Sequence, residues 1–522
     1  MKSKLCGAGL VAAILVLLCG SILQTLGGTS FLTTKSHNDW GNDDAYISYH
    51  YAENLAAGKG LVFNPGERVE GYSNLLYVLL MVPAFLVTNR DGIYFFSVFL
   101  NLIFAVGAWW IFTTYVRRKL GDTSALMAGL LFALCLPLWV AVASGMETCL
   151  ALLIYVGVWV TVEGVASDPT RRRLILLCIL MMLSVLTRVD GFLVPGIGIA
   201  YLALKRQHRA AVVCASTVLA TLGVLELWRL YYYHALLPTT YYVKIAGPIA
   251  WRLKYALSQL SRIALFDGFL AYLLVLGLAA GEGLRRVIAS RGRDFTLLRF
   301  EAFFALCWIT YWFYIGGDHF WDRFLVVLFP MGIFALLNYL KEAAHVRVTA
   351  FVVVLLAILQ VGPPRYTDPR FHYVFNKFDA WVGVGKFLAE TYPGQTLALA
   401  PIGKIPFFSG MYTIDMLGLV DPVIAHEPVS AKRYEPGHLK FDPNYILSRH
   451  PGVIVAAVDP DGYLGYGLTL SECEKAGYRI QYLANTRRPP PAERMVDVFG
   501  MNKETIMHLM ADGYELAVLA KK

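Results

Sequence analysis

Residues 93–116 read IYFFSVFLNLIFAVGAWWIFTTYV and are followed directly by Arg117, Arg118 and Lys119. This run is apolar almost throughout and is long enough to cross the hydrocarbon core of a bilayer as one helix. A basic cluster directly after such a run is typical of the cytoplasmic side of a membrane. The segment therefore predicts a membrane span that ends inside the cell.

Similar apolar runs recur over the first two thirds of the chain. The 522 residues are 57% hydrophobic and only 16% charged, a composition that excludes an ordinary soluble protein. Judged against the thickness of a bilayer, we expect about eleven transmembrane helices. The predicted spans are 6–28, 93–116, 124–142, 147–165, 174–187, 192–204, 210–232, 266–284, 300–315, 323–340 and 348–362.

The loops between these runs carry charges that set an orientation. Lys2 and Lys4 place the N-terminus inside, because cytoplasmic loops are enriched in Lys and Arg. Residues 72–87 are apolar too, and we expect a helix that lies in, or dips into, the outer face, since a full span would put the next basic loop outside. The net charge of +9 is then mainly a topology signal and requires no nucleic-acid partner. The basic loops predicted inside are 117–119, 171–173, 205–209, 285–293 and 341–347.

Nearly every other unusual polar cluster then falls on the outer side of the membrane. Polar residues with only a structural role would have no reason to gather on one side, so this clustering favours a functional site there. The clusters are Asp43 with Asp44, 144–148, 187–191, 234–244, 316–323 and the chain beyond residue 363.

Beyond residue 362 the hydropathy falls and the pattern changes. Short β-rich runs alternate with amphipathic stretches, which predicts a soluble, extracytoplasmic mixed α/β domain over 363–522. Residues 1–362 form the predicted membrane domain, whose first outer loop covers about 29–92. Residues 403–410 and 414–421 read as a strand and turns close to the membrane. The β-rich runs are 396–400, 453–457 and 516–519, and the amphipathic stretches are 378–391 and 503–511.

Two adjacent carboxylates open the first outer loop in the sequence NDDAYI, residues 42–47. A carboxylate at a membrane surface can take a proton from a sugar hydroxyl. We therefore expect Asp44 to be the base of a membrane glycosyltransferase, with Asp43 as its neighbour or as a ligand of sugar hydroxyls. The competing interpretation is that both residues cap a helix.

A glycosyltransferase on the outer side has no ready supply of nucleotide sugars, so it would draw a lipid-phosphate sugar from the bilayer. Cationic side chains must then stabilise the departing phosphate. Each candidate could instead be a snorkelling interface residue, and Arg188 with Asp190, or Asp318 with Arg323, could be structural ion pairs. The candidates for donor binding are Lys244, Arg323, His319, Lys404, Arg188, Asp318, Tyr241 and Glu147, with Arg229 as a further possibility.

Two of these residues carry a specific alternative. Glu147 is either the N-terminal cap of the next span or a site residue. Tyr241 fits either an aromatic belt at the interface or a surface on which a sugar stacks.

The sequence gives no requirement for a metal or another cofactor. It contains no CxxC or HxxxH spacing of a zinc site, no Walker loop, and no GxGxxG that opens a helix after a strand. A divalent cation could still bind at Asp43 and Asp44, and transfer would then be metal-assisted.

The motifs together resemble the bacterial GT-C glycosyltransferases, most of all the terminal arabinofuranosyltransferases of mycobacterial cell-wall arabinan and the related pilin arabinosyltransferases. The likeness spans most of the chain. It departs from the family pattern at Val189, Thr239, Phe407 and Phe408, which puts the identity of the sugar and acceptor in question. The motifs are 42–47 (NDDAYI), 51–55 (YAENL), 58–67 (GKGLVFNPGE), 69–74 (VEGYSN), 144–148 (SGMET), 186–191 (LTRVDG), 232–244, 316–319 (GGDH) and 403–421.

This resemblance implies a polytopic α-helical GT-C membrane domain with an outer C-terminal domain, placed in a bacterial plasma membrane. It implies inverting transfer of a sugar, D-arabinofuranose, from decaprenylphosphoryl arabinofuranose to a hydroxyl on a cell-envelope glycan or protein. Asp44 or Asp43 would be the catalytic aspartate.

Three rivals remain open at this point. One is a GT-C enzyme that uses another polyprenyl-phosphate sugar. A second is a transporter or flippase of a lipid-linked saccharide, for which charges in the middle of the membrane and repeat symmetry are expected. The third is a noncatalytic assembly protein whose outer domain binds cell-wall polymer.

Overall fold

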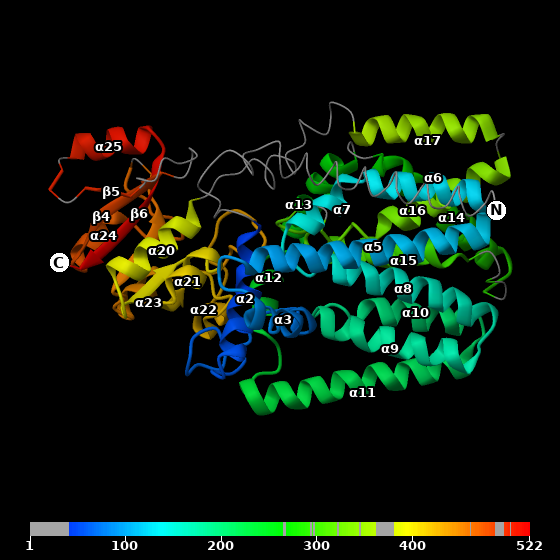
Figure 1. Ribbon diagram of the computed structural model, residues 1–522, viewed down its shortest axis with the longest axis horizontal. Coiled ribbons are helices and arrows are strands. Elements are labelled where there is room, and N and C mark those ends of the chain that lie inside the picture. Colours follow the sequence, from blue (N-terminus) through cyan, green and yellow to red (C-terminus); the bar gives the residue numbers. More distant parts are fainter. Residues whose placement is uncertain are drawn as a thin grey trace.

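A computed structural model describes residues 41–521, except 265–267, 293–294, 296–297, 321–322, 344–345, 362–379, 460, 486–494, 499 and 502. A bundle of long helices occupies one end of the molecule and an α/β domain the other (Figure 1). Helix α2 (Asp43–Ala56) lies between the two parts. The beginning of the described chain is therefore held at the boundary between the bundle and the α/β domain.

Three helices within the described residues are long and apolar enough to cross a membrane: α5 (Ile93–Leu120), α8 (Thr148–Ser167) and α11 (His208–Tyr233). The count rises to five if two bent helix pairs, α6 (Asp122–Leu134) with α7 (Leu136–Ala143) and α13 (Ile249–Ala264) with α14 (Phe269–Ala289), each form one span. The remaining helices of the bundle are α9 (Arg171–Thr187), α10 (Leu193–Leu204), α15 (Phe300–Ile315), α16 (Leu328–Ala343) and α17 (Val346–Val361).

The predicted helix positions agree closely with this bundle. Every predicted span from 93–116 to 348–362 overlaps a helix or a helix pair, while the span at 6–28 lies outside the described residues. Among the described residues, three to five helices or helix pairs qualify as full spans by length and composition, because several of the others are short. The chain is a multi-pass membrane protein with a helical membrane domain, and which end faces the cytoplasm stays a prediction.

The bend between α6 and α7 has a local cause. The two helices meet at 51° just before Pro137, which lies in the first turn of α7. Proline has no N–H to donate to the carbonyl four residues earlier. The indole Nε1–H of Trp139 donates to that carbonyl, on Ala133, at 2.8 Å, so the bend leaves this carbonyl satisfied.

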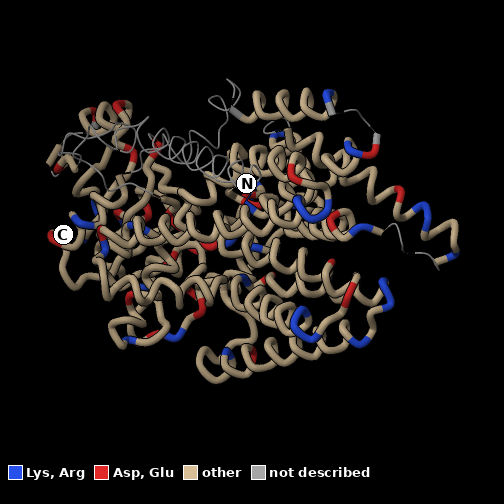
Figure 2. Tube along the Cα trace, turned by 45° about the vertical axis from the view of Figure 1, so that its right-hand side comes forward, with Lys and Arg blue, Asp and Glu red and all other residues tan. Residues whose placement is uncertain are grey.

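Charged residues are unevenly distributed over the molecule. Figure 2 shows Lys and Arg at the end of the bundle that is far from the α/β domain, and few charges along the middle of the helices. The last turn of α5, with Arg117, Arg118 and Lys119, is one of these basic segments. This pattern matches a membrane-spanning bundle with basic loops at one end.

The α/β domain is built on a six-stranded mixed sheet with the order β2-β1-β3-β6-β4-β5. β1 is parallel to β2 and β3, whereas β6 is antiparallel to β3 and β4. The prediction of a mixed α/β domain is confirmed. Its elements are α20 (Trp381–Thr391), β1 (Thr396–Leu399), α21 (Lys404–Ser409), β2 (Tyr412–Asp415), α22 (Pro422–His426), α23 (Pro443–Ser448), β3 (Val453–Ala457), α24 (Leu470–Lys475), β4 (Tyr478–Asn485), β5 (Met495–Asp497), α25 (Lys503–Ala511) and β6 (Tyr514–Lys521).

The expectation of a strand over 403–410 is wrong, because α21 occupies this segment. Pro406 falls in the first turn of this helix, where its missing N–H costs nothing. Gly410 follows with φ 65° and ends the helix in the left-handed conformation. The segment after β2 forms the predicted turns.

The loop predicted as the first outer one lies between the bundle and the α/β domain (Figure 1). It contains α2, α3 (Leu75–Met81) and α4 (Ala84–Val87), so the helix expected over 72–87 is present as two short pieces. The ring of Tyr46 on α2 packs edge-on against Phe407 on α21, with centroids 5.5 Å apart. Aromatic packing therefore joins this loop to the α/β domain.

Candidate active site

A cavity of about 1170 Å³ lies where the first loop, the helix ends and the α/β domain meet. Its walls come from segments that are far apart in the sequence. The sequence-predicted residues on its wall are Asp43, Asp44, Arg188, Asp190, Tyr241, Lys244, Asp318, His319 and Arg323. The polar clusters predicted to share one side of the membrane thus gather around one cavity.

Asp43 and Asp44 are the first two residues of α2. The N-cap is Asn42, and its side chain makes no capping hydrogen bond. The interpretation that both aspartates cap the helix is therefore wrong, although both lie in the first turn of α2, where the positive end of the helix dipole stabilises carboxylates.

The Asp43 carboxylate forms hydrogen bonds with the α/β domain. Its Oδ2 accepts a hydrogen bond of 2.9 Å from the backbone N–H of Gly403, and its Oδ1 accepts one of 2.7 Å from that of Lys404. Burial raises the pKa of Asp43 to about 6, and the hydrogen bonds and positive charge from Lys404 oppose this rise. Both oxygens of Asp43 therefore hold α21 in place.

Asp44 is in a different situation. Asp44 is partly exposed and lines the cavity. Its side chain makes no hydrogen bond or ion pair with any residue that the structure describes. A carboxylate without partners in a cavity wall is available to a substrate hydroxyl.

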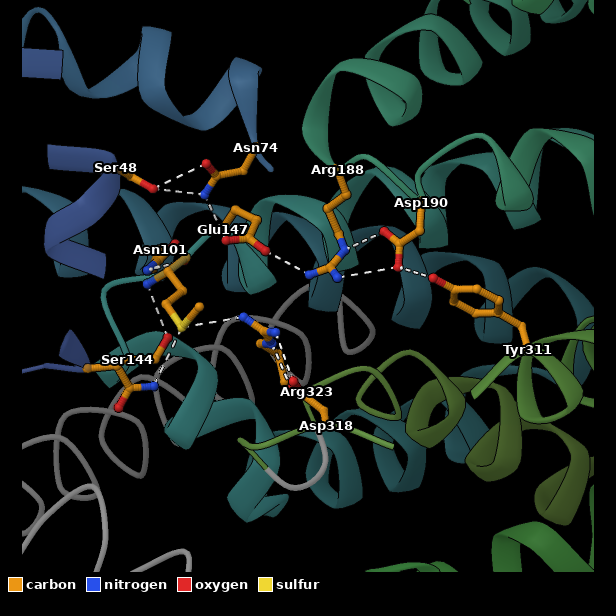
Figure 3. A network of polar contacts seen from close by, with 12 residues as sticks. Ser48, Asn74, Asn101, Ser144, Glu147, Arg188, Asp190, Tyr311, Asp318 and Arg323 are labelled. Atoms are coloured by element: carbon orange, nitrogen blue, oxygen red, sulfur yellow. Dashed lines mark hydrogen bonds and ion pairs between the residues drawn. The ribbon is translucent and has the colours of Figure 1, made fainter. Parts of the chain in front are cut away.

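A network of polar side chains includes Arg188 and Asp190 of the cavity wall (Figure 3). Arg188 donates from Nη1 to Glu147 Oε1 at 2.7 Å and from Nε to Asp190 Oδ1 at 2.8 Å. Tyr311 donates to Asp190 at 3.0 Å, and Asn74 donates to Glu147 at 2.9 Å. Two carboxylates face one guanidinium, so Arg188 is not a free cation for a phosphate.

Arg323 forms a second ion pair on the cavity wall. Its Nε and Nη2 donate to the two carboxylate oxygens of Asp318 at 2.9 and 3.0 Å. The backbone N–H of Asp318 donates to Gln259 Oε1 at 3.1 Å. This hydrogen bond fixes the loop that carries the ion pair. The alternative of structural ion pairs, considered for both Arg188 and Arg323, is the arrangement that the structure contains.

Lys244 differs from these two arginines. It is in the last turn of α12 (Thr239–Lys244) and lines the cavity, but no ion pair joins it to the described residues. Thr239, at the other end of α12, donates through its hydroxyl to the carbonyl of Leu419 at 2.5 Å. The α/β domain therefore contacts and helps to position the short helix that presents Lys244.

Two predicted residues do not line the cavity. Lys404 is 1% exposed, and its side-chain ammonium lies 6.0 Å from the centre of the Tyr46 ring. Glu147 is the N-cap position of α8 and is 2% exposed, with its carboxylate turned to Arg188 and Asn74. Direct contact of either residue with a donor phosphate does not fit these positions. Arg229, the further candidate, forms a buried ion pair of 2.6 Å with Glu70.

Sequence reasoning missed a loop of the α/β domain that lines the cavity. Lys432, Arg433, Glu435 and His438 all line it. The charged pair at 432–433 followed by the turn-forming Pro436 and Gly437 was a local signal of an exposed loop, but nothing in the sequence indicated that this loop faces the first loop.

Known proteins share the fold with this chain at low identity. An oligosaccharyltransferase of Archaeoglobus fulgidus, in complex with Zn and sulfate, is similar with a TM-score of 0.54 at 13% identity, over 91% of this chain and 72% of that chain. ArnT from Cupriavidus metallidurans in the apo state is similar with a TM-score of 0.50 at 12% identity, over 100% of this chain and 98% of that chain. The chain thus has a GT-C-like fold.

Other comparisons add little to this result. The arabinofuranosyltransferase AftD from Mycobacteria is similar with a TM-score of only 0.40 at 12% identity, over 98% of this chain and 41% of that chain, and does not bear on the sugar. A family model described as a domain of unknown function (DUF8728) matches residues 374–488. No curated protein sequence matches the chain.

Proposed function

We propose that this protein is an inverting glycosyltransferase that moves a sugar from a polyprenyl-phosphate donor to an acceptor hydroxyl, with Asp44 as the base. The observation that carries the proposal is the Asp44 carboxylate, which lines a cavity of about 1170 Å³ without a partner among the described residues. Similarity in fold to an oligosaccharyltransferase supports the reaction class.

The reaction needs one proton transfer and one displacement. Asp44 takes the proton of the acceptor hydroxyl while that oxygen forms a bond to the anomeric carbon of the sugar. The bond between the anomeric carbon and the phosphate oxygen breaks on the opposite face, and its electron pair leaves with the polyprenyl phosphate. The products are the inverted glycoside, the lipid phosphate and a protonated Asp44.

Lys244 is the proposed partner of the departing phosphate. Arg188 and Arg323 are both neutralised by carboxylates, whereas Lys244 can offer its charge to a ligand. Cations aimed at a leaving phosphate stabilise the charge that develops in the transition state. The exposed residues Lys432 and Arg433 add further positive charge to the cavity lining.

A lipid carrier fits the rim of the cavity. Tyr314, Phe192 and Tyr241 line it and are 50%, 44% and 38% exposed. Exposed aromatic rings at helix ends are typical of a membrane interface, and there they would contact the first isoprene units of the donor.

D-Arabinofuranose from decaprenylphosphoryl arabinofuranose is the proposed sugar, and a hydroxyl on a cell-envelope glycan or protein is the proposed acceptor. This part of the proposal rests on the motif resemblance that begins at residues 42–47. The proposal places the cavity and the α/β domain outside the cytoplasm of a bacterial cell.

The test uses purified protein in nanodiscs with synthetic polyprenylphosphoryl arabinofuranose and an arabinan-like oligosaccharide, with products followed by mass spectrometry. Wild type and Asp512→Asn, a change at an exposed aspartate of the outer domain, should add a pentose, and Asp44→Asn should not. Undiminished transfer by folded Asp44→Asn would overturn the role of Asp44. Transfer from a different polyprenyl-phosphate sugar alone would retain the reaction class and exclude arabinose.

A further inference from the structure

Three potential metal ligands meet on the wall of the cavity although two loops far apart in the sequence supply them. His319, Glu435 and His438 each offer one ligand atom within 4.8 Å of the others. The Nδ1 of His319 is 3.7 Å from Oε1 of Glu435. The two imidazole rings have their centroids 5.3 Å apart.

A tight turn brings two of these residues together. The backbone N–H of His438 donates to the carbonyl of Glu435 at 3.1 Å. Between them stand Pro436 and Gly437, and Gly437 has a φ of +82°. Proline followed by a glycine with positive φ is the signature of a type II turn, which places the first and fourth residues close to each other.

The supporting contacts hold both loops in position. Tyr434 donates through its hydroxyl to the carbonyl of Ile315 at 3.2 Å, which fastens the turn to the end of α15. On the other side, the contact between Asp318 and Gln259 fixes the residue next to His319. The cluster is therefore set between two anchored segments.

His438 also has the secondary contact expected of a metal ligand. Its Nδ1 lies 2.9 Å from the carbonyl of Pro436, and because a carbonyl can only accept, Nδ1 carries the proton. The lone pair of the neutral ring is then on Nε2. A hydrogen bond from the second ring nitrogen to a backbone carbonyl commonly orients histidines that bind metals.

We propose that His319, Glu435 and His438 bind a divalent transition-metal ion of the zinc class. Two imidazoles and one carboxylate form a donor set that favours zinc over magnesium or calcium, which prefer oxygen ligands. Ligand atoms around tetrahedral zinc lie roughly 3.4 Å apart, given metal–ligand bonds of about 2.1 Å. The 3.7 Å between Nδ1 of His319 and Oε1 of Glu435 is close to this spacing.

The site has two consequences for the molecule. The ion joins the outer domain, through Glu435 and His438, to His319 at the end of the bundle. Three protein ligands leave a fourth position of a tetrahedral ion open, and all three residues line the cavity that also contains Asp44. When bound, the ion supplies a Lewis-acidic charge on this wall.

The inference does not depend on the proposed function, and metal binding alone tests it. Full-length protein in detergent is stripped with EDTA and then titrated with ZnCl₂ in competition with a chromophoric chelator, and bound zinc is counted by mass spectrometry. We expect one zinc ion per chain at this site and an increase in the temperature of unfolding. Excess MgCl₂ should not displace it.

The variants His438→Gln and Glu435→Gln should each weaken zinc binding by about 100-fold, because each removes a ligand. His426→Gln and Glu427→Gln, which alter the same residue types elsewhere in the outer domain, should bind zinc like wild type. The metal-free forms of all four variants should unfold at the temperature of metal-free wild type, which excludes misfolding. Absence of bound zinc in wild type, or equal affinity in the ligand variants and their controls, would overturn the proposal.

Discussion

The carboxylate of Asp43 accepts a hydrogen bond of 2.7 Å from the backbone N–H of Lys404, a residue 361 positions further along the chain. The bond connects the first turn of α2 to the first turn of α21. The N-terminus of α21 is thus satisfied by α2, because two of its orphan N–H groups find a carboxylate there. This contact ties the α/β domain to α2 beside the cavity that Asp44 lines.

Substitution of Gly403 should disrupt this contact. A Cβ atom at Gly403 would lie 1.9 Å from the backbone carbonyl oxygen of Asp43, so Gly403→Ala forces α2 and α21 apart. We expect a loss of about 1–3 kcal/mol in the free energy of unfolding, as for unmade buried hydrogen bonds, together with loss of transfer. Thermal unfolding and the transfer assay measure both.

The control for this variant is Gly383→Ala. Gly383 is within helix α20, and a Cβ there meets nothing within 4 Å, so alanine should leave stability unchanged or raise it slightly. If Gly403→Ala and Gly383→Ala behaved alike, close docking of α21 on α2 would not be required.

The stability of the protein should depend on pH through Asp43. Burial raises the pKa of this carboxyl to about 6 in the folded chain, whereas an unfolded aspartate ionises near about 4. Protonated Asp43 therefore contributes its full stabilisation to the folded state below about pH 4, and this contribution is lost as the pH rises through about 6. Relative to that of Asp43→Asn, the free energy of unfolding of wild type should therefore fall by on the order of 3 kcal/mol over this interval.

Unfolding midpoints of wild type and Asp43→Asn in buffers from about pH 4 to pH 8 check this expectation. Asp512→Asn serves as the control, since its aspartate is exposed and its curve should run parallel to that of wild type. Parallel curves for Asp43→Asn as well would contradict the raised pKa.

The buried ion pair between Glu147 and Arg188 should matter much more than an exposed one. The side chains are 2% and 12% exposed, and loss of one partner leaves the other charge uncompensated. Glu147→Gln should lower the free energy of unfolding by about 3 kcal/mol. Glu342→Gln, which removes an exposed contact with Arg299, should change it by less than about 1 kcal/mol. Equal shifts in the unfolding temperature would refute the structural role of the network.

Removal of the Lys244 charge should weaken the enzyme's use of the donor and leave its use of the acceptor unchanged. Lys244→Gln is expected to lower kcat/KM for the lipid-phosphate sugar by about tenfold or more, because a charged contact to phosphate contributes about 1.5–3 kcal/mol. The apparent KM for the oligosaccharide should stay the same. Lys254→Gln, at an exposed lysine of α13, is the matched control. An unchanged donor dependence in Lys244→Gln would show that other groups bind the phosphate.

Local pattern was sufficient to predict the class of the molecule and most of its helices. The apolar run at 93–116 and the basic residues after it depend only on neighbours in the chain, and α5 covers the same residues. The alternation of short β-rich and amphipathic stretches likewise predicted the mixed sheet. The segment 403–410 was misread because its Gly and Pro residues serve helix ends as well as turns.

The state of each charge in the candidate site could be predicted only in part. Arg188 and Arg323 each lie close in the sequence to an aspartate, and the ion pairs with Asp190 and Asp318 were alternatives that the sequence already offered. The contact of Arg188 with Glu147 joins residues 41 positions apart, and a local pattern carries no information on such a contact or on the lack of an ion pair for Lys244 among the described residues.

By itself, then, the sequence determined a polytopic helical protein with a C-terminal α/β domain and a pair of aspartates after the first apolar run. Only the tertiary structure separated the roles of that pair, since Asp43 is bound by the N–H groups of Gly403 and Lys404 while Asp44 faces the cavity. It also brought His319 to the turn that carries Glu435 and His438. The physical reason is that secondary structure and membrane insertion follow from short-range periodicity and hydrophobicity, whereas a site is made by long-range packing.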